Sequence, residues 1–96
     1  MTNNISYEWC AEFVDEYDDI QETDSSTNKA DIWPPKFEVE NCKARLSCAR
    51  ILGDDVNGIQ ERGYAYAGDE TFSTGQKVPP QIKKQLQAAK KIKESI

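Results

Sequence analysis

Alternation of apolar and polar side chains predicts that this chain is organised around one hairpin. Two strand-like runs, 44–52 and 59–67, flank a connection that begins with Gly53 and ends with Gly58. Glycine, Asp and Asn tolerate the backbone angles of turns, so we expect a β-hairpin with a loop of about six residues. Gly63, in the middle of the second run, indicates a bulge or the close approach of a neighbouring ring.

Both faces of this hairpin carry apolar side chains. Leu46 and Cys48 share one face of the first run, whereas Ala49 and Ile51 occupy the other. We therefore expect a helix to pack on one side of the hairpin and the N-terminal segment to cover part of the other side.

The N-terminal run 6–14 has a period of two. Large aromatic side chains at Tyr7, Trp9 and Phe13 share one face of an extended chain, which predicts an amphipathic strand lying on the core. A helix is the alternative, because Trp9, Phe13 and Tyr17 are spaced four residues apart.

The C-terminal run has the clearest helical pattern. Pro80 suits a first helical turn, where its missing N–H costs nothing. One apolar stripe follows at helical spacing: Ile82, Leu86, Ala89, Ile92 and Ile96. These patterns together predict a single small α+β domain over residues 1–96. Its antiparallel sheet of three to five strands is centred on the 44–67 hairpin, and one C-terminal α-helix (80–95) packs on a face.

The segments between these elements give weaker signals. Residues 20–24 can pair back on the first run as a short strand, and the polar run 25–30 predicts a mobile loop. Alternation over 37–41 predicts a weak strand. Phe72 is the large apolar residue of a second loop and is expected to tuck under the sheet edge.

Charge is divided unevenly along the chain. The net charge is −5, but residues 1–40 hold eleven acids and two bases, whereas residues 41–96 hold six acids and ten bases. Nucleic-acid and anionic-membrane binders need clustered Lys and Arg, so an acidic chain is not expected to bind either directly. No run is long and apolar enough to predict a membrane span or a signal peptide.

The acids are concentrated near the N-terminus. Between Glu8 and Asp24 there are eight acids and no base. Such a run is commonly a solvated face, and the functional alternative is an acidic docking surface. On that alternative the residues expected to contact a partner are Asp15, Asp18, Asp19, Glu22, Asp24 and Trp33. Trp33 precedes two prolines and either pins its loop to the core or stands exposed as a binding anchor.

The sequence lacks the residues that common catalytic, phosphate-binding and metal-binding sites use. The sequence contains no His, no CxxC, and neither a phosphate-binding nor a zinc-binding motif. The three cysteines, Cys10, Cys42 and Cys48, indicate a reduced, cytosolic setting, and Cys10 and Cys48 are expected to be inert in strands. Residues 54–58 lack the alternation and the closing Glu of a calcium loop. We therefore expect no catalytic residues, no metal and no cofactor.

Short motifs resemble those of one group of proteins. Tyr7-Glu8-Trp9, Val14-Asp15-Glu16 and Asp18-Asp19-Ile20 are similar to the opening of small uncharacterised proteins encoded by tailed bacteriophages. The later motifs of that resemblance are Gly53-Asp54-Asp55, Gly58-Ile59, Glu61-Arg62, Tyr64-Ala65-Tyr66 and Lys77-Val78-Pro79. The resemblance implies a phage gene product that is made in the cytoplasm of an infected bacterial host, and no catalytic residue is carried over from the group.

These observations favour a binding protein over an enzyme. The leading hypothesis is a non-enzymatic phage protein that binds a basic surface of a host protein and inhibits host transcription or defence. The alternatives are a small structural component of the virion or its assembly, and a DNA mimic. The oligomeric state is left open.

Overall fold

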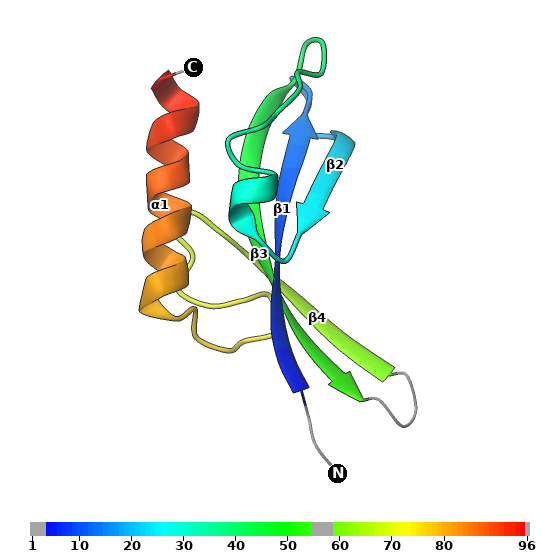
Figure 1. Cartoon of the computed structure of the whole chain (residues 1–96), viewed down its shortest axis with the longest axis vertical. Coiled ribbons are helices and arrows are strands. Elements are labelled where there is room, and N and C mark those ends of the chain that lie inside the picture. Colours follow the sequence, from blue (N-terminus) through cyan, green and yellow to red (C-terminus); the bar gives the residue numbers. More distant parts are fainter. Residues whose placement is uncertain (1–3, 55–58, 96) are drawn as a thin grey trace.

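A computed structural model describes residues 4–54 and 59–95 of the chain. In that part, four antiparallel strands form one sheet in the order β2-β1-β3-β4, and an α-helix lies beside it (Figure 1). The elements are β1 (Asn4–Val14), β2 (Ile20–Ser26), the 3₁₀-helix η1 (Lys29–Asp31), β3 (Lys43–Asp54), β4 (Ile59–Tyr66) and α1 (Pro80–Ser95). The predicted α+β class, the central hairpin and the terminal helix are confirmed.

The N-terminal strand lies inside the sheet and does not cover it. Ala11 of β1 is paired with Asp24 of β2 on one side and with Leu46 of β3 on the other. The strand prediction for 6–14 and the back-pairing of 20–24 are therefore confirmed, and the helical alternative is wrong. The expected covering role of this segment is also wrong, because β1 pairs with β3 along its whole length and with β2 from Trp9 to Val14.

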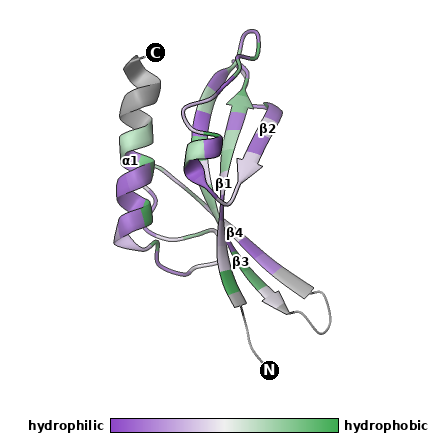
Figure 2. Ribbon diagram, in the orientation of Figure 1, coloured by the Kyte–Doolittle hydropathy of each residue, from purple (hydrophilic) through white to green (hydrophobic). Residues whose placement is uncertain are grey.

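One face of the sheet, which we call the covered face, packs against α1 and η1. Hydrophobic and hydrophilic residues alternate along β1 and β3, as Figure 2 shows, and the alternation places apolar side chains on this face. Buried side chains of α1 and of the strands form one cluster, which includes Trp9, Ala11, Phe13, Leu46, Cys48, Ala65, Ile82, Leu86 and Ala89. The predicted helix stripe is confirmed as far as Ala89, whereas the side chains of Ile92 and Ile96 lie outside the described ones. Each large buried side chain stabilises the fold by about 1.5–3 kcal/mol.

A loop after β4 closes the lower part of this core. Phe72 is buried beside the ring of Tyr7, with 6.1 Å between their centroids, as the sequence predicts. The backbone N–H of Ser73 donates to the carbonyl of Tyr64 at 2.9 Å, which holds the loop against β4. A Cβ on Gly63 would collide with the side chain of Thr74, so this glycine does allow a close approach. The neighbour is not the predicted ring, and the register of β3 and β4 has no bulge at Gly63.

Two of the weaker segment predictions need correction. The run 25–30, predicted as a loop, contains the end of β2 and most of η1, because Asn28 caps η1 by accepting from the N–H of Ala30 at 3.2 Å. The strand predicted over 37–41 is wrong. Asn41 adopts a left-handed φ of 63°, and a turn forms in which the N–H of Cys42 donates to the carbonyl of Val39.

The opposite face of the sheet, which we call the open face, has no helix against it in the described residues. Register places Glu12, Arg45, Ser47 and Tyr66 there, together with Ala49. Residues 55–58 of the predicted hairpin loop, which include most of the calcium-like run, lie outside the described residues. Gly53 and Asp54 belong to β3.

Candidate interaction surface

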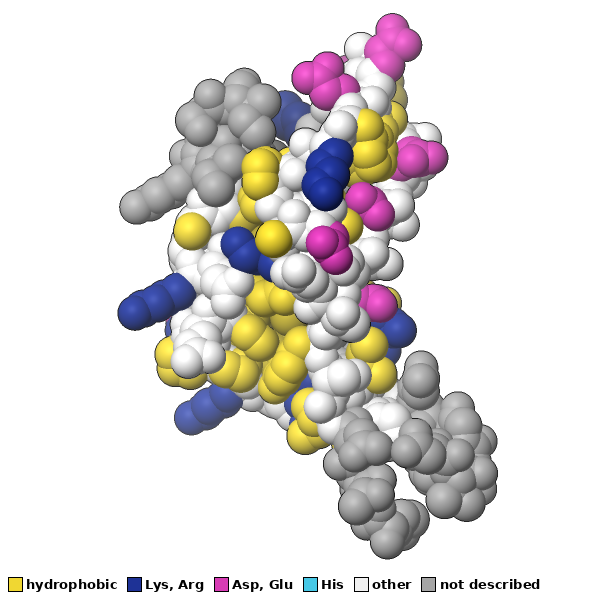
Figure 3. Space-filling view, viewed as in Figure 1, with side chains coloured by type: hydrophobic (Ala, Val, Ile, Leu, Met, Phe, Trp, Pro, Cys, Tyr) yellow, Lys and Arg dark blue, Asp and Glu magenta, His cyan; other side chains and the backbone are white. Residues whose placement is uncertain are grey.

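The predicted acidic residues occupy one hairpin. Residues 15–24, which we call the acidic ribbon, comprise the turn after β1 and most of β2. Because β2 is an edge strand, one side of the ribbon faces away from the sheet. Figure 3 shows acidic side chains over β2 and over the loop that precedes β3. The five predicted acids are therefore brought together, and Trp33 is not among them.

Two of these acids form hydrogen bonds or ion pairs that stabilise the turn. The carboxylate of Asp15 accepts hydrogen bonds from the N–H groups of Tyr17 (2.9 Å) and Asp19 (3.0 Å) and from the side-chain amide of Gln21 (2.8 Å). Asp18 has a left-handed φ of 66° and lies 3.3 Å from the guanidinium of Arg45. Asp15 and Asp18 thus shape the ribbon, which reduces what they can offer a partner.

The other three acids have no ion pair among the described side chains. Asp19 and Glu22 are exposed, Asp24 is half-buried, and none is in an ion pair with a described basic side chain. Alternation along β2 puts Glu22 and Asp24 on the same side of the strand. On the helix, Lys83 pairs with Glu70 instead of the ribbon. The charge of the ribbon is therefore left for solvent or for a partner.

Two apolar side chains stand among these acids, and sequence reasoning missed them. Tyr17 is 77% exposed in the turn and Ile20 is 49% exposed at the start of β2. Aromatic residues are enriched where proteins bind each other. The missed signal was an aromatic residue inside a charged turn, a position with no core to fill.

A second unpredicted feature is a buried carboxylate on the open face. Glu12 is 5% exposed, and its oxygens accept from Arg45 Nε (2.8 Å), from the hydroxyl of Tyr66 (3.0 Å) and from Ser47 Oγ (3.4 Å). The Arg45 guanidinium also lies over the Tyr66 ring, 4.8 Å from its centroid. Three donors from two neighbouring strands therefore satisfy this carboxylate, as a buried charge requires.

Burial raises the pKa values of a tyrosine in this network and of two thiols elsewhere in the sheet. Desolvation, the negative charge of Glu12 and the hydrogen bond to it raise the pKa of Tyr66 to about 12. Burial raises the pKa of the Cys48 thiol to about 12, and burial with the nearby Glu12 raises that of Cys10. Both thiols therefore stay protonated near neutral pH, in agreement with their predicted inertness.

The structure contradicts one alternative for Trp33. Its side chain is 3% exposed and belongs to the core cluster, so an exposed binding anchor is wrong. The residue follows η1, whose turn is closed by the N–H of Trp33 donating to the carbonyl of Lys29 at 2.9 Å. This turn directs the chain back over the covered face, where the indole ring is buried.

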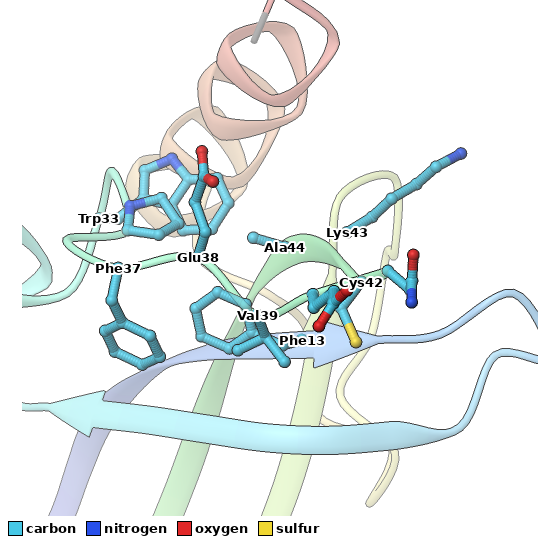
Figure 4. A pocket seen from close by; sticks show the side chains of 11 residues that line it. Phe13, Trp33, Phe37, Glu38, Val39, Cys42, Lys43 and Ala44 are labelled. Atoms are coloured by element: carbon cyan, nitrogen blue, oxygen red, sulfur yellow. The ribbon is translucent and has the colours of Figure 1, made fainter.

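A groove lies beside Trp33. It has a volume of about 890 Å³ and is bounded by the segment 33–42 and by the adjoining ends of β1 and β3 (Figure 4). Its apolar lining includes Phe13, Trp33, Phe37, Val39 and Ala44, and its polar lining includes Glu38, Glu40 and Lys43.

Comparison with known proteins does not narrow the choice of function. No protein family, curated protein or solved structure shows significant similarity to the chain. Among the described residues, no group of three or more acidic, Cys or His side chains could hold a metal ion. No helix in the same part of the chain is long and apolar enough to cross a membrane.

Proposed function

We propose that this protein is a non-enzymatic phage protein that binds a host protein by docking its acidic ribbon on a basic surface. The observation that carries the proposal is the exposed acid pair Asp19 and Glu22, which no described cation neutralises. The same ribbon exposes Tyr17 and Ile20, which supply apolar contact area.

Electrostatics assigns the two kinds of ribbon residue different roles. The acids attract a basic partner over several ångströms and raise the association rate more than the final affinity. Tyr17 and Ile20 become desolvated at contact and slow dissociation. The resemblance to phage proteins supports a host protein as the target. Occupying a basic surface of that target would inhibit host transcription or defence.

Charge reversal in the ribbon tests this proposal. The protein would be immobilised on a resin and incubated with bacterial lysate, and the captured partners would be identified by mass spectrometry. The affinity of the protein for each purified partner would then be measured. We expect Asp19→Lys with Glu22→Lys to weaken the specific partner at least about tenfold, which is about 1.4 kcal/mol. Glu61→Lys with Glu70→Lys makes the same change in net charge outside the ribbon and serves as the control. Equal effects of the two variants on every partner would reject ribbon docking.

Two further measurements separate this proposal from its alternatives. A DNA mimic should lose its partner steeply between low and moderate salt, because phosphate-like contacts are screened. A virion component should self-associate or travel with particles in size-exclusion chromatography. We expect a salt dependence weaker than that of phosphate contacts and no association with particles.

A further inference from the structure

The groove beside Trp33 has no role in ribbon docking, and its lining has a definite chemistry. The rings of Phe13 and Phe37 are stacked, with 4.8 Å between centroids and 29° between planes. Phe13 is buried, whereas Phe37 is 42% exposed. One ring of the stack therefore belongs to the core and the other stands at the groove with much of its surface in water.

Trp33, which lines the groove, carries a buried polar atom that is unpaired in the described part of the chain. The indole Nε1 of Trp33 is buried and has no hydrogen-bond partner among the described residues. Most binding pockets combine an apolar lining with a few polar groups, and this groove does so.

The rim of the groove is predominantly acidic. Glu38 and Glu40 are exposed at the rim, together with Lys43. The groove includes the end of β1 at Phe13, immediately before the acidic ribbon. Figure 3 shows acidic side chains at the same end of the molecule. The field at the groove mouth therefore favours a cationic ligand.

We propose that this groove binds a segment of the partner protein in which a large apolar side chain is flanked by Lys or Arg. The apolar anchor packs on the exposed ring of Phe37, above the buried side chains of Phe13 and Trp33, and the flanking cations face Glu38 and Glu40. An acidic peptide or a fatty acid would be repelled at this rim. A second copy of this chain, with a net charge of −5, is disfavoured for the same reason. The inference rests on the proposed function and names the element of the partner that is recognised.

A peptide titration tests the inference on the intact chain. The probe is a short peptide with leucine at helical spacing and lysine at the other positions. Two matched peptides replace either every lysine with glutamate or every leucine with alanine. Binding is followed by the indole N–H resonance of Trp33, which the Trp9→Phe variant distinguishes from the only other tryptophan. We expect the leucine–lysine peptide alone to shift the Trp33 resonance.

Alkylation of the cysteines gives a second readout. Cys42 lines the groove, whereas Cys10 lies in β1 with its side chain toward the open face. At a peptide concentration ten times Kd, alkylation of Cys42 should slow about tenfold, because only the empty groove reacts. Alkylation of Cys10 should keep its rate. Equal slowing of both thiols would indicate a general effect on the fold and would overturn the proposal.

Two variants separate the groove from the ribbon. Ala44→Phe fills the groove beside Phe13, and Glu38→Lys with Glu40→Lys reverses the rim without touching the core. Both should abolish the peptide-induced shift of Trp33, and Glu61→Lys with Glu70→Lys should preserve it. If rim reversal leaves peptide binding unchanged, or if the glutamate peptide binds equally well, the groove proposal is wrong. Loss of the captured partner on Asp19→Lys with Glu22→Lys would then still support ribbon docking by itself.

Discussion

The two faces of the sheet bury their central residues by different means. On the covered face, apolar side chains of the strands meet Leu86 and its neighbours on α1, and burial is largely hydrophobic. On the open face no described helix is present, yet Glu12 is 5% exposed and Ala49 is 1% exposed. The long side chains of neighbouring strands, Arg45 and Tyr66, surround the buried carboxylate.

This difference shows what each face can tolerate. A hydrophobic face is stabilised by the apolar area that it removes from water. Its tolerance of substitutions therefore depends on how far the new side chain changes the buried volume. The open face depends on pairing, because a charge removed from water is costly unless its partners are present. The same strands β1, β3 and β4 contribute to both faces, so substitutions on adjacent residues should fail for different physical reasons.

The largest effect is expected on the covered face. Leu86 is 1% exposed in the middle of α1. Leu86→Ala should lower the free energy of unfolding by about 2–5 kcal/mol, because it removes buried methyl groups and leaves a cavity. Leu86→Asp should detach the helix altogether. Urea denaturation followed by circular dichroism measures both changes.

Gln87→Ala is the matched control for Leu86. The side chain of Gln87 is exposed on the same helix, and its replacement should change the stability by no more than about 0.5 kcal/mol. Similar losses at the two positions would mean that α1 is not held by this contact.

A smaller effect is expected from the ion pair of the open face. Arg45→Met removes the charged donor 2.8 Å from Glu12 and should cost about 1.5–3 kcal/mol. The value is below that of a fully buried pair, because the Arg45 side chain is 28% exposed. Adding Glu12→Met should recover part of the loss, since the unpaired buried charge is removed while the hydroxyls of Tyr66 and Ser47 lose an acceptor. A double variant no more stable than Arg45→Met would contradict the pairing argument.

The covered face was more predictable from sequence than the open face. Its residues follow simple periods, two for Trp9, Ala11 and Phe13 and about 3.6 for Ile82, Leu86 and Ala89, and each period reports one buried side. Glu12 fits the polar phase of the same alternation, so the pattern predicts a solvated acid at this position. Its burial depends on the register that pairs β1 with β3 and brings Arg45 opposite it, which spacing along the chain does not specify.

The candidate site was predictable in part for a similar reason. The acids of the ribbon are contiguous in sequence, so their common placement followed from one short hairpin. Sequence could not specify that Asp15 caps its own turn or that Asn41 turns the chain and excludes a strand at 37–41. The groove depends on long-range packing of Trp33 and Phe37 against Phe13, and no local period encodes it.

Alkaline pH should weaken the open face selectively. Burial, Glu12 and their hydrogen bond raise the pKa of Tyr66 to about 12, above the value near 10 of an unfolded tyrosine. Because the folded pKa is the higher one, this stabilisation is complete below pH 10 and is lost as the pH rises toward 12. Between pH 10 and pH 12 the free energy of unfolding should fall by about 1–2 kcal/mol less in Tyr66→Phe than in the unmodified protein. This range is below the full value of the pKa shift because Tyr66 is partly exposed. Tyr64→Phe is the control. Burial also raises the pKa of the Cys48 thiol to about 12. Measuring the free energy of unfolding against pH in the Cys48→Ala background separates the contribution of Tyr66 from that of this thiol.

The smallest effect is expected from the Arg62–Glu8 ion pair on the open face. Arg62 donates to Glu8 at 2.9 Å, but both side chains are about one-third exposed, at 37% and 31%. Water and salt screen such a pair, so Arg62→Ala should cost only about 0.2–1 kcal/mol. The loss should shrink further in high salt. Thermal unfolding of Arg62→Ala and Arg45→Met at low and high salt compares the two pairs directly. A loss at Arg62 equal to that at Arg45 would mean that ionic contact, and not burial of Glu12, determines the stability of the open face.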